Sequence, residues 1–178
     1  MLTNLDVKSF NIVRAYNRNY IETVLDGLTI YTCYLDDLSE NTRLLEMDAL
    51  LDKIHTPAVI HGDLNTFTKE DLTLPNKIQE EFVVNNTELT KKLEPILDEM
   101  KRCEVVETLK TRGFIDSARE FKPTMPSKLF PAVIKAPFIR VDYILHTKDV
   151  SSENAMVYTD TLYDTVSDHY PISATIKY

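Results

Sequence analysis

The 178-residue sequence predicts an α/β fold, an α+β sandwich of strands and helices in a single domain over residues 1–178. Two observations lead to this prediction. Short segments rich in β-branched and aromatic residues alternate with segments of helical periodicity, and the strand-like segments gather at both ends of the chain. Hydrophobic residues make up 43% and charged residues 27% of the chain, which is typical of a protein with a globular core.

The first third of the chain predicts a β-hairpin followed by a helix. Residues 10–24 are expected to form one strand, Asp26 and Gly27 a turn, and residues 28–35 a second strand. Ser39 is a candidate N-cap for a helix over residues 40–54. The apolar stripe of that helix is expected to consist of Leu44, Met47, Leu51 and Ile54, with Leu50 beside them.

The remainder of the chain predicts further strands around a polar, helix-prone region at residues 68–112. Thr68 and Asp71 form a possible capping box, and Pro95 could open a helix that ends at Gly113. A proline-rich loop is expected at residues 123–137. The predicted strands are residues 57–64, 138–145, 154–159 and 172–177.

Composition excludes several classes of protein. The net charge of -8 disfavours a protein held to nucleic acid mainly through phosphates, and no glycine-rich nucleotide-binding motif occurs. Cys33 and Cys103 are far apart and are expected to be free thiols. No apolar run approaches the ~20 residues of a membrane span and no signal peptide is recognisable, so a cytoplasmic protein is expected, with the nucleus as an alternative.

Three predicted strands carry or border polar residues of one chemical kind. Asp63 and Asn65 end the strand at 57–64, Asp142 lies within the next apolar strand, and Asp168 and His169 precede the last one. Such residues have ordinary explanations, because an aspartate after a strand is often a turn residue and a histidine is often simply packed. A carboxylate inside an apolar strand, however, needs a partner such as a histidine or an arginine.

Together these residue types suit phosphoester hydrolysis. That reaction needs a base to orient water and donors for the charge that builds up on the phosphate, usually with a divalent cation. Carboxylate and amide oxygens favour Mg²⁺ over zinc, and an aspartate beside a histidine fixes the tautomer or favours the protonated form of the imidazole.

Three blocks resemble the signature blocks of the endonuclease/exonuclease/phosphatase superfamily, the deoxyribonuclease I-like group of metal-dependent phosphoesterases. They are GDLN at 62–65, RVDYIL at 140–145 and SDHYPI at 167–172, and they occur in the order that the family has. Residues 28–54 also resemble the family's strand-then-helix block. The resemblance implies a four-layer αββα fold, of which this sequence is expected to hold the C-terminal portion, truncated at the N-terminus.

The resemblance also implies a role for each matching residue. Asp63 would orient or deprotonate the attacking water, and Asn65 would contact the phosphate. Asp142 would orient His169, which would donate a hydrogen bond to a phosphate oxygen. Asp168 would help to hold Mg²⁺, or Mn²⁺ in its place.

Two departures from the family pattern stand out. The histidine usual in the strand-then-helix block is Tyr34 here, as in abasic-site endonucleases, and a phenol can also donate a hydrogen bond to a phosphate oxygen. Tyr34 could equally be a plain strand aromatic. The family's early asparagine and its main metal-ligand glutamate have no counterpart in residues 1–27, so the cation is expected to bind weakly.

Three functions therefore stay open: a Mg²⁺-dependent phosphoesterase, a weak or inactive remnant that binds or regulates, and an acidic interaction domain. The substrate of an enzyme would be a phosphate ester of a nucleic acid, a nucleotide or a phospholipid head group. A sheet without its partner sheet would expose an apolar face, which a second copy or another chain could cover.

Overall fold

The structure, a computed structural model, describes residues 6–73, 88–118, 120, 122–125, 127 and 139–178. Its main element is a six-stranded sheet with the strand order β1-β2-β3-β4-β6-β5. A separate two-stranded sheet pairs β7 with β8. The strands are β1 (Ser9–Ala15), β2 (Arg18–Val24), β3 (Thr29–Tyr34), β4 (Ala58–Asp63), β5 (Phe114–Asp116), β6 (Asp142–Thr147), β7 (Ser151–Val157) and β8 (Ile172–Lys177).

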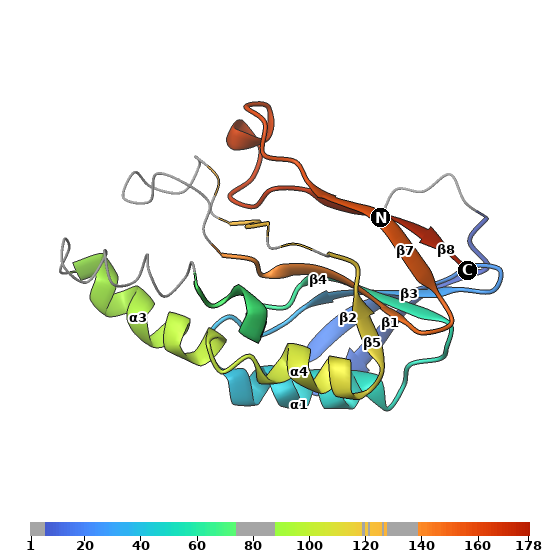
Figure 1. Cartoon of the computed structure of the whole chain (residues 1–178). Helices are drawn as coiled ribbons and strands as arrows, with labels where there is room; N and C mark the ends of the chain where they lie inside the picture. The colour runs from blue at the N-terminus through green and yellow to red at the C-terminus, as the bar shows by residue number, and fades with distance from the viewer. Residues whose placement is uncertain (1–5, 74–87, 119, 121, 126, 128–138) are drawn as a thin grey trace.

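The elements form layers around the large sheet. Helices α1 (Glu40–Leu51) and α4 (Glu104–Thr111) lie along one face, and the β7–β8 hairpin lies on the opposite face (Figure 1). The main core lies under the helices and includes Tyr31, Met47, Leu50, Leu109 and Leu145. A smaller core between the sheets includes Leu28, Val59 and Val150, with Ile176 of β8 packed against it. The predicted α/β class is therefore confirmed.

The predicted hairpin over residues 10–35 is wrong in one respect, because the segment contains three strands. A turn at Tyr16 and Asn17 divides residues 10–24 into β1 and β2, which pair antiparallel. Tyr16 has a φ of 56°, in the left-handed region that a tyrosine seldom adopts. Because a tyrosine stands where a glycine would be expected, the sequence contains no signal for this turn. The turn at Asp26 and Gly27 and the strand after it occur as predicted.

Helix α1 begins as predicted, since the Ser39 side chain accepts a hydrogen bond from the backbone N–H of Thr42. The helix ends at Leu51, three residues earlier than expected. Of the predicted stripe Met47 is fully buried, as is its neighbour Leu50, and the other members are partly buried against the same core.

The expected capping box and the expected long helix are both corrected. Thr68 precedes only a short 3-10 turn, η1 (Lys69–Asp71), and makes no side-chain cap, because Asp71 instead forms an ion pair with Arg140 at 2.7 Å. Pro95 lies inside helix α3 (Glu88–Met100) rather than at its start. A left-handed residue, Cys103, then separates α3 from α4, and Gly113 ends the segment as predicted.

The later strands differ from the prediction mainly in their bounds. Strand β5 was not predicted, and β6 begins at Asp142, so this carboxylate starts the strand rather than lying in its middle. Strand β7 begins three residues before the predicted 154, and β8 has the predicted bounds. A second 3-10 turn, η2 (Tyr163–Thr165), lies between them. Most of the proline-rich segment, residues 128–137, lies outside the described residues.

Two further predictions bear on the surface and the thiols. Cys33 and Cys103 are free and buried. On β1, Val13 packs against the helix-side core, whereas Phe10 and Ile12 are 54% and 71% exposed. No helix in the described part of the chain is long and apolar enough to cross a membrane.

Candidate active site

The site begins with a row of side chains across three adjacent strands. Strand β3 runs parallel to β4, and Tyr34 is the register partner of Asp63. Strand β4 runs antiparallel to β6, and Asp63 is the register partner of Asp142. Register partners on neighbouring strands point to the same face of a sheet. Tyr34, Asp63 and Asp142 therefore lie side by side where these three neighbouring strands end or begin. We call these three residues the strand-end row.

His169 reaches this row from the loop before β8. Its Nδ1 lies 2.8 Å from Oδ2 of Asp142, and the two side chains are only 24% and 17% exposed. The hydrogen bond to Asp142 raises the pKa of His169 above the ordinary value, with Asp63 and Asp168 adding to the effect. The protonated imidazole is therefore favoured, and Nε2 is the nitrogen left to face a ligand.

Asp63 is the most perturbed carboxyl group of the row. Burial and the neighbouring Asp142 raise its pKa to about 7, although the backbone N–H of Asn65, His169 and Arg43 act in the opposite direction. The N–H of Asn65 donates to Asp63 Oδ1 at 2.9 Å. A carboxylate that titrates near neutral pH is suited to accept a proton in catalysis.

The turn from Gly62 to Asn65 sets the direction of both polar side chains. Gly62 has a φ of 131°, and a Cβ there would lie 2.0 Å from the backbone oxygen of Cys33. Asn65 has a φ of 50°, also in the left-handed region. Its side-chain Nδ2 donates to the carbonyl of Leu35 at 3.0 Å, which fixes the amide beside the end of β3.

We expect Gly62→Ala to destabilise the protein by about 3 kcal/mol or more, because the added methyl meets backbone and the φ angle is strained. Gly113→Ala is the matched control, since Gly113 also has a positive φ of 88° but no described atom lies within 4 Å of its added Cβ. We expect the control to cost only about 1 kcal/mol. Urea unfolding of both variants checks this, and equal losses would contradict the close contact at Gly62.

Tyr34 is half exposed at the end of β3, where a ligand could reach its hydroxyl. Partial burial and the acids Asp37 and Asp63 raise its pKa, so the phenol stays protonated at neutral pH and can donate a hydrogen bond. The guanidinium of Arg18 lies over the ring, 5.0 Å from its centroid. Nε of Arg18 also forms an ion pair with Oε1 of Glu46 at 3.3 Å, which fixes the guanidinium against one face of the Tyr34 ring.

Asp168, the predicted metal ligand, lies next to His169 but is not shown as a member of a metal cluster. Its backbone carbonyl accepts a hydrogen bond from the N–H of Ser127 at 2.8 Å. Within the described ranges, no three His, Cys, Asp or Glu side chains are grouped closely enough to hold a metal ion. Asp168 therefore does not belong to a three-residue cluster of these types among the described residues, and a Mg²⁺ ion held there would keep most of its water ligands.

Sequence reasoning missed a set of buried charges behind the site. Glu40, Arg43 and Glu46 of α1 are all fully buried, and they contact the loops that carry the strand-end row. Their spacing of three residues along a helix was the available signal, because it places them on one face. Charges at such spacing normally indicate a solvent-exposed face, so the signal pointed the wrong way.

Comparison with known proteins shows what this arrangement resembles. No protein-family model and no curated protein matches the sequence. Among solved structures, an AP endonuclease from Archaeoglobus fulgidus is similar with a TM-score of 0.70 at 14% identity. The Neisseria 3′ phosphatase NExo, in a structure bound to product DNA hairpin, is similar with a TM-score of 0.69 at 16% identity. An endonuclease/exonuclease/phosphatase from Bacteroides vulgatus has a TM-score of 0.57 at 14% identity.

The chain has the endonuclease/exonuclease/phosphatase fold. The three similarities cover 98%, 99% and 89% of this chain, respectively, but only 72%, 73% and 54% of the other chains. The chain thus spans about half to three quarters of the length of these endonuclease/exonuclease/phosphatase-fold proteins. The deoxyribonuclease I-like fold that the three sequence blocks implied is confirmed, over nearly all of the chain.

Proposed function

We propose that the protein hydrolyses phosphate esters at the strand-end row and His169. The observation that carries the proposal is the placement of Asp63, with a pKa near 7, beside an Asp142–His169 pair joined at 2.8 Å. A base and a charged hydrogen-bond donor at one sheet edge are the two groups that attack by water on a phosphate requires. The endonuclease/exonuclease/phosphatase fold supports the same reaction class.

The side chains divide the reaction between them. Asp63 accepts a proton from water as the water oxygen bonds to phosphorus, and the bond from phosphorus to the leaving-group oxygen breaks. Protonated His169, held by Asp142, stabilises the charge on a phosphate oxygen. Tyr34 and Asn65 flank Asp63 and contact the remaining phosphate oxygens. The leaving-group oxygen takes up a proton from solvent water and departs as an alcohol, and protonated Asp63 then returns its proton to solvent.

The substrate class follows from two opposing observations. Of the similar structures, one is a 3′ phosphatase bound to product DNA hairpin and another is an AP endonuclease, which favours a nucleotide phosphoester. The net charge of -8 opposes binding of long nucleic acid. We therefore propose a short phosphoester substrate. Hydrolysis of bis(4-nitrophenyl) phosphate and of a 3′-phosphorylated trinucleotide tests the proposal, and absence of turnover on both would overturn it.

We also propose that a divalent cation binds weakly at this site. Asp168 would hold Mg²⁺, or Mn²⁺, beside the phosphate, where the ion would neutralise phosphate charge. Because the described residues do not complete its site, the steps above use side chains only.

We expect Mg²⁺ at 10 mM to stabilise the folded protein by no more than about 0.4 kcal/mol, the value for a dissociation constant near 10 mM. Differential scanning fluorimetry should then show a melting temperature shift of only about 1–2 °C. Asp168→Asn is expected to remove this shift, and NaCl at the same ionic strength is the control. A much larger shift would contradict the weak site.

The second candidate is a non-catalytic domain that retains the fold and binds phosphate groups. The observation that favours it is the incomplete metal cluster within the described residues. The two candidates differ in one result, because a binding domain would hold a phosphate ester without turnover. Product formation by wild-type protein that Asp63→Asn abolishes would exclude this second candidate.

A further inference from the structure

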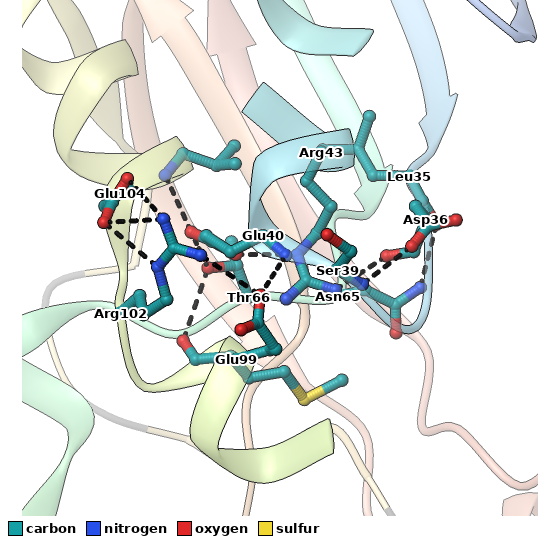
Figure 2. Close-up of polar contacts among 12 residues, drawn as sticks. Leu35, Asp36, Ser39, Glu40, Arg43, Asn65, Thr66, Glu99, Arg102 and Glu104 are labelled. Carbon is teal, nitrogen blue, oxygen red and sulfur yellow. Dashed lines mark hydrogen bonds and ion pairs between the residues drawn. The ribbon is translucent and has the colours of Figure 1, made fainter. Parts of the chain in front are cut away.

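Helix α1 contains a buried ion pair that belongs to none of the three hydrophobic core clusters of the described residues. Arg43 and Glu40 are fully buried, and Nε of Arg43 lies 2.7 Å from Oε2 of Glu40 (Figure 2). Buried ion pairs contribute little net stability, because desolvation of the two charges offsets their attraction. Apolar side chains of similar size would fill the same space, so the pair calls for another explanation.

One side of the ion pair leads to Asn65 through two neighbouring carbonyl groups. Nη1 of Arg43 donates to the carbonyl of Asp36 at 2.8 Å. The carbonyl of the preceding residue, Leu35, accepts from Nδ2 of Asn65 at 3.0 Å. Figure 2 shows Arg43 and Asn65 beside the Leu35–Asp36 segment. Arg43 therefore fixes the Leu35–Asp36 segment, to which the side-chain amide of Asn65 is hydrogen-bonded.

The other side of the ion pair leads back to the residue next to Asn65. Oε1 of Glu40 accepts from the hydroxyl of Thr66 at 2.9 Å and from the backbone N–H of Val105 at 3.0 Å. The ion pair is therefore linked to two consecutive residues. Arg43 is linked to Asn65 through the Leu35–Asp36 segment, and Glu40 accepts a hydrogen bond directly from Thr66. Arg43 and Glu40 are called the clamp from here on.

Asn65 lies in a tight turn with its backbone in the left-handed region, at a φ of 50°, which asparagine adopts more readily than most residues. The same residue donates its N–H to Asp63 Oδ1 at 2.9 Å, so a shift of Asn65 would also move or release the base. Arg43 lowers the pKa of Asp63 against the stronger effect of burial, which places its charge within electrostatic reach of the base. Movements of about 1 Å at a reacting group cost up to about 100-fold in rate.

We propose that Arg43 is a positioning residue of the phosphoesterase site, which acts through Glu40 and the Leu35 and Asp36 carbonyls to hold Asn65 and, through it, Asp63. The kinetic part of this inference depends on the proposed function. Its structural part, the dependence of the Asn65 side chain on the clamp, does not.

The test replaces the whole clamp with neutral side chains, in the double variant Glu40→Gln with Arg43→Met, so that no buried charge is left alone. We expect kcat for bis(4-nitrophenyl) phosphate to fall about 10- to 100-fold with a smaller change in KM. In an Asn65→Ala background the same double substitution is expected to lower kcat less than about threefold, because the residue it positions is already absent. Equal losses in both backgrounds would overturn the proposal.

Met47→Ala is the matched control for loss of stability. Met47 is fully buried in the same helix but lies in the main core rather than in the clamp. We expect it to lower the melting temperature without changing kcat at a temperature where the protein is folded. A comparable fall in kcat for Met47→Ala would show that any disturbance of α1 has the same effect, and would overturn the specific role of Arg43.

Nuclear magnetic resonance separates this inference from the proposed function. In the clamp variant, the side-chain amide resonances of Asn65 are expected to shift and their hydrogen exchange to accelerate, whereas Met47→Ala should leave both unchanged. This result is expected even if wild-type protein hydrolyses nothing, in which case the proposed function fails and the clamp stands. Unchanged Asn65 resonances in the clamp variant would overturn the clamp whatever the activity.

Discussion

Replacing Asp63 by asparagine is expected to lower kcat by roughly 100- to 10,000-fold, the contribution of a positioned general base. Asparagine keeps the size of the side chain and an oxygen that can accept the Asn65 N–H, so the turn should be preserved. What it removes is the group that takes the proton from water. Asp149→Asn, an exposed aspartate in the loop between β6 and β7, is the matched control and should retain full activity.

The same substitution should stabilise the protein at high pH. A carboxyl group whose folded pKa is about 7, against an ordinary value of 3.8, contributes stability that is complete below pH 3.8 and is lost as the pH rises through 7. At about 1.4 kcal/mol per pKa unit, Asp63→Asn is expected to raise the free energy of unfolding by on the order of 1–4 kcal/mol at pH 8, because it removes this buried charge. Wild-type activity should rise over the same pH range, since only ionised Asp63 is a base, and should fall again at higher pH, where His169 loses the proton that it needs as a donor.

Melting curves at pH 4.5 and pH 8 check the stability effect. We expect Asp63→Asn to exceed wild type in melting temperature at pH 8, and to exceed it by much less at pH 4.5. A variant that is less stable than wild type at pH 8 would mean that Asp63 is ionised without cost, and would contradict the burial that raises its pKa.

Replacing His169 by alanine is expected to lower kcat by roughly 100- to 1,000-fold, the usual loss when one preorganised donor to a developing charge is removed. Asp142→Asn should give a smaller loss, because His169 would remain but would lose the partner that raises its pKa. At pH 8, where Asp63 is mostly ionised with or without its neighbour Asp142, the double variant is expected to be no worse than His169→Ala alone, since Asp142 then acts on phosphate through His169.

Steady-state kinetics with bis(4-nitrophenyl) phosphate check these values, and His55→Ala is the control because His55 is exposed and outside the strand-end row. Additive losses in the double variant would contradict the pair, because they would mean that Asp142 and His169 act independently. Full activity of His169→Ala would contradict its role at the phosphate.

The sequence predicted the elements whose signals are local. Ser39 marks the start of α1, and the alternation of residues 172–177 gives β8 its bounds. Asp63 and Asp142 could be proposed as site residues because each borders an apolar strand, and their neighbouring register follows from the sheet order. The deoxyribonuclease I-like fold was predicted because three such blocks occur in one order.

Other features depend on tertiary contacts that a local pattern does not contain. The turn at Tyr16 is formed by a bulky residue with a φ of 56°, a conformation that pairing of β1 with β2 imposes. Pro95 lies inside α3 although its ring favours a first turn. The clamp was invisible for a related reason: Glu40 and Arg43 look like surface charges until Thr66, Val105 and the Asp36 carbonyl supply their buried partners.

Whether Asp63 is the base of a phosphoesterase is decided by hydrolysis of bis(4-nitrophenyl) phosphate between pH 5 and 9, with 10 mM Mg²⁺, by wild type, Asp63→Asn and Asp149→Asn. Wild type and Asp149→Asn are expected to turn over with activity that rises through pH 7. Asp63→Asn is expected to show at most about one hundredth of the wild-type activity at pH 8, and the difference is expected to narrow toward pH 5, where Asp63 of wild type is protonated. Turnover by Asp63→Asn at the wild-type rate at pH 8 would exclude Asp63 as the base.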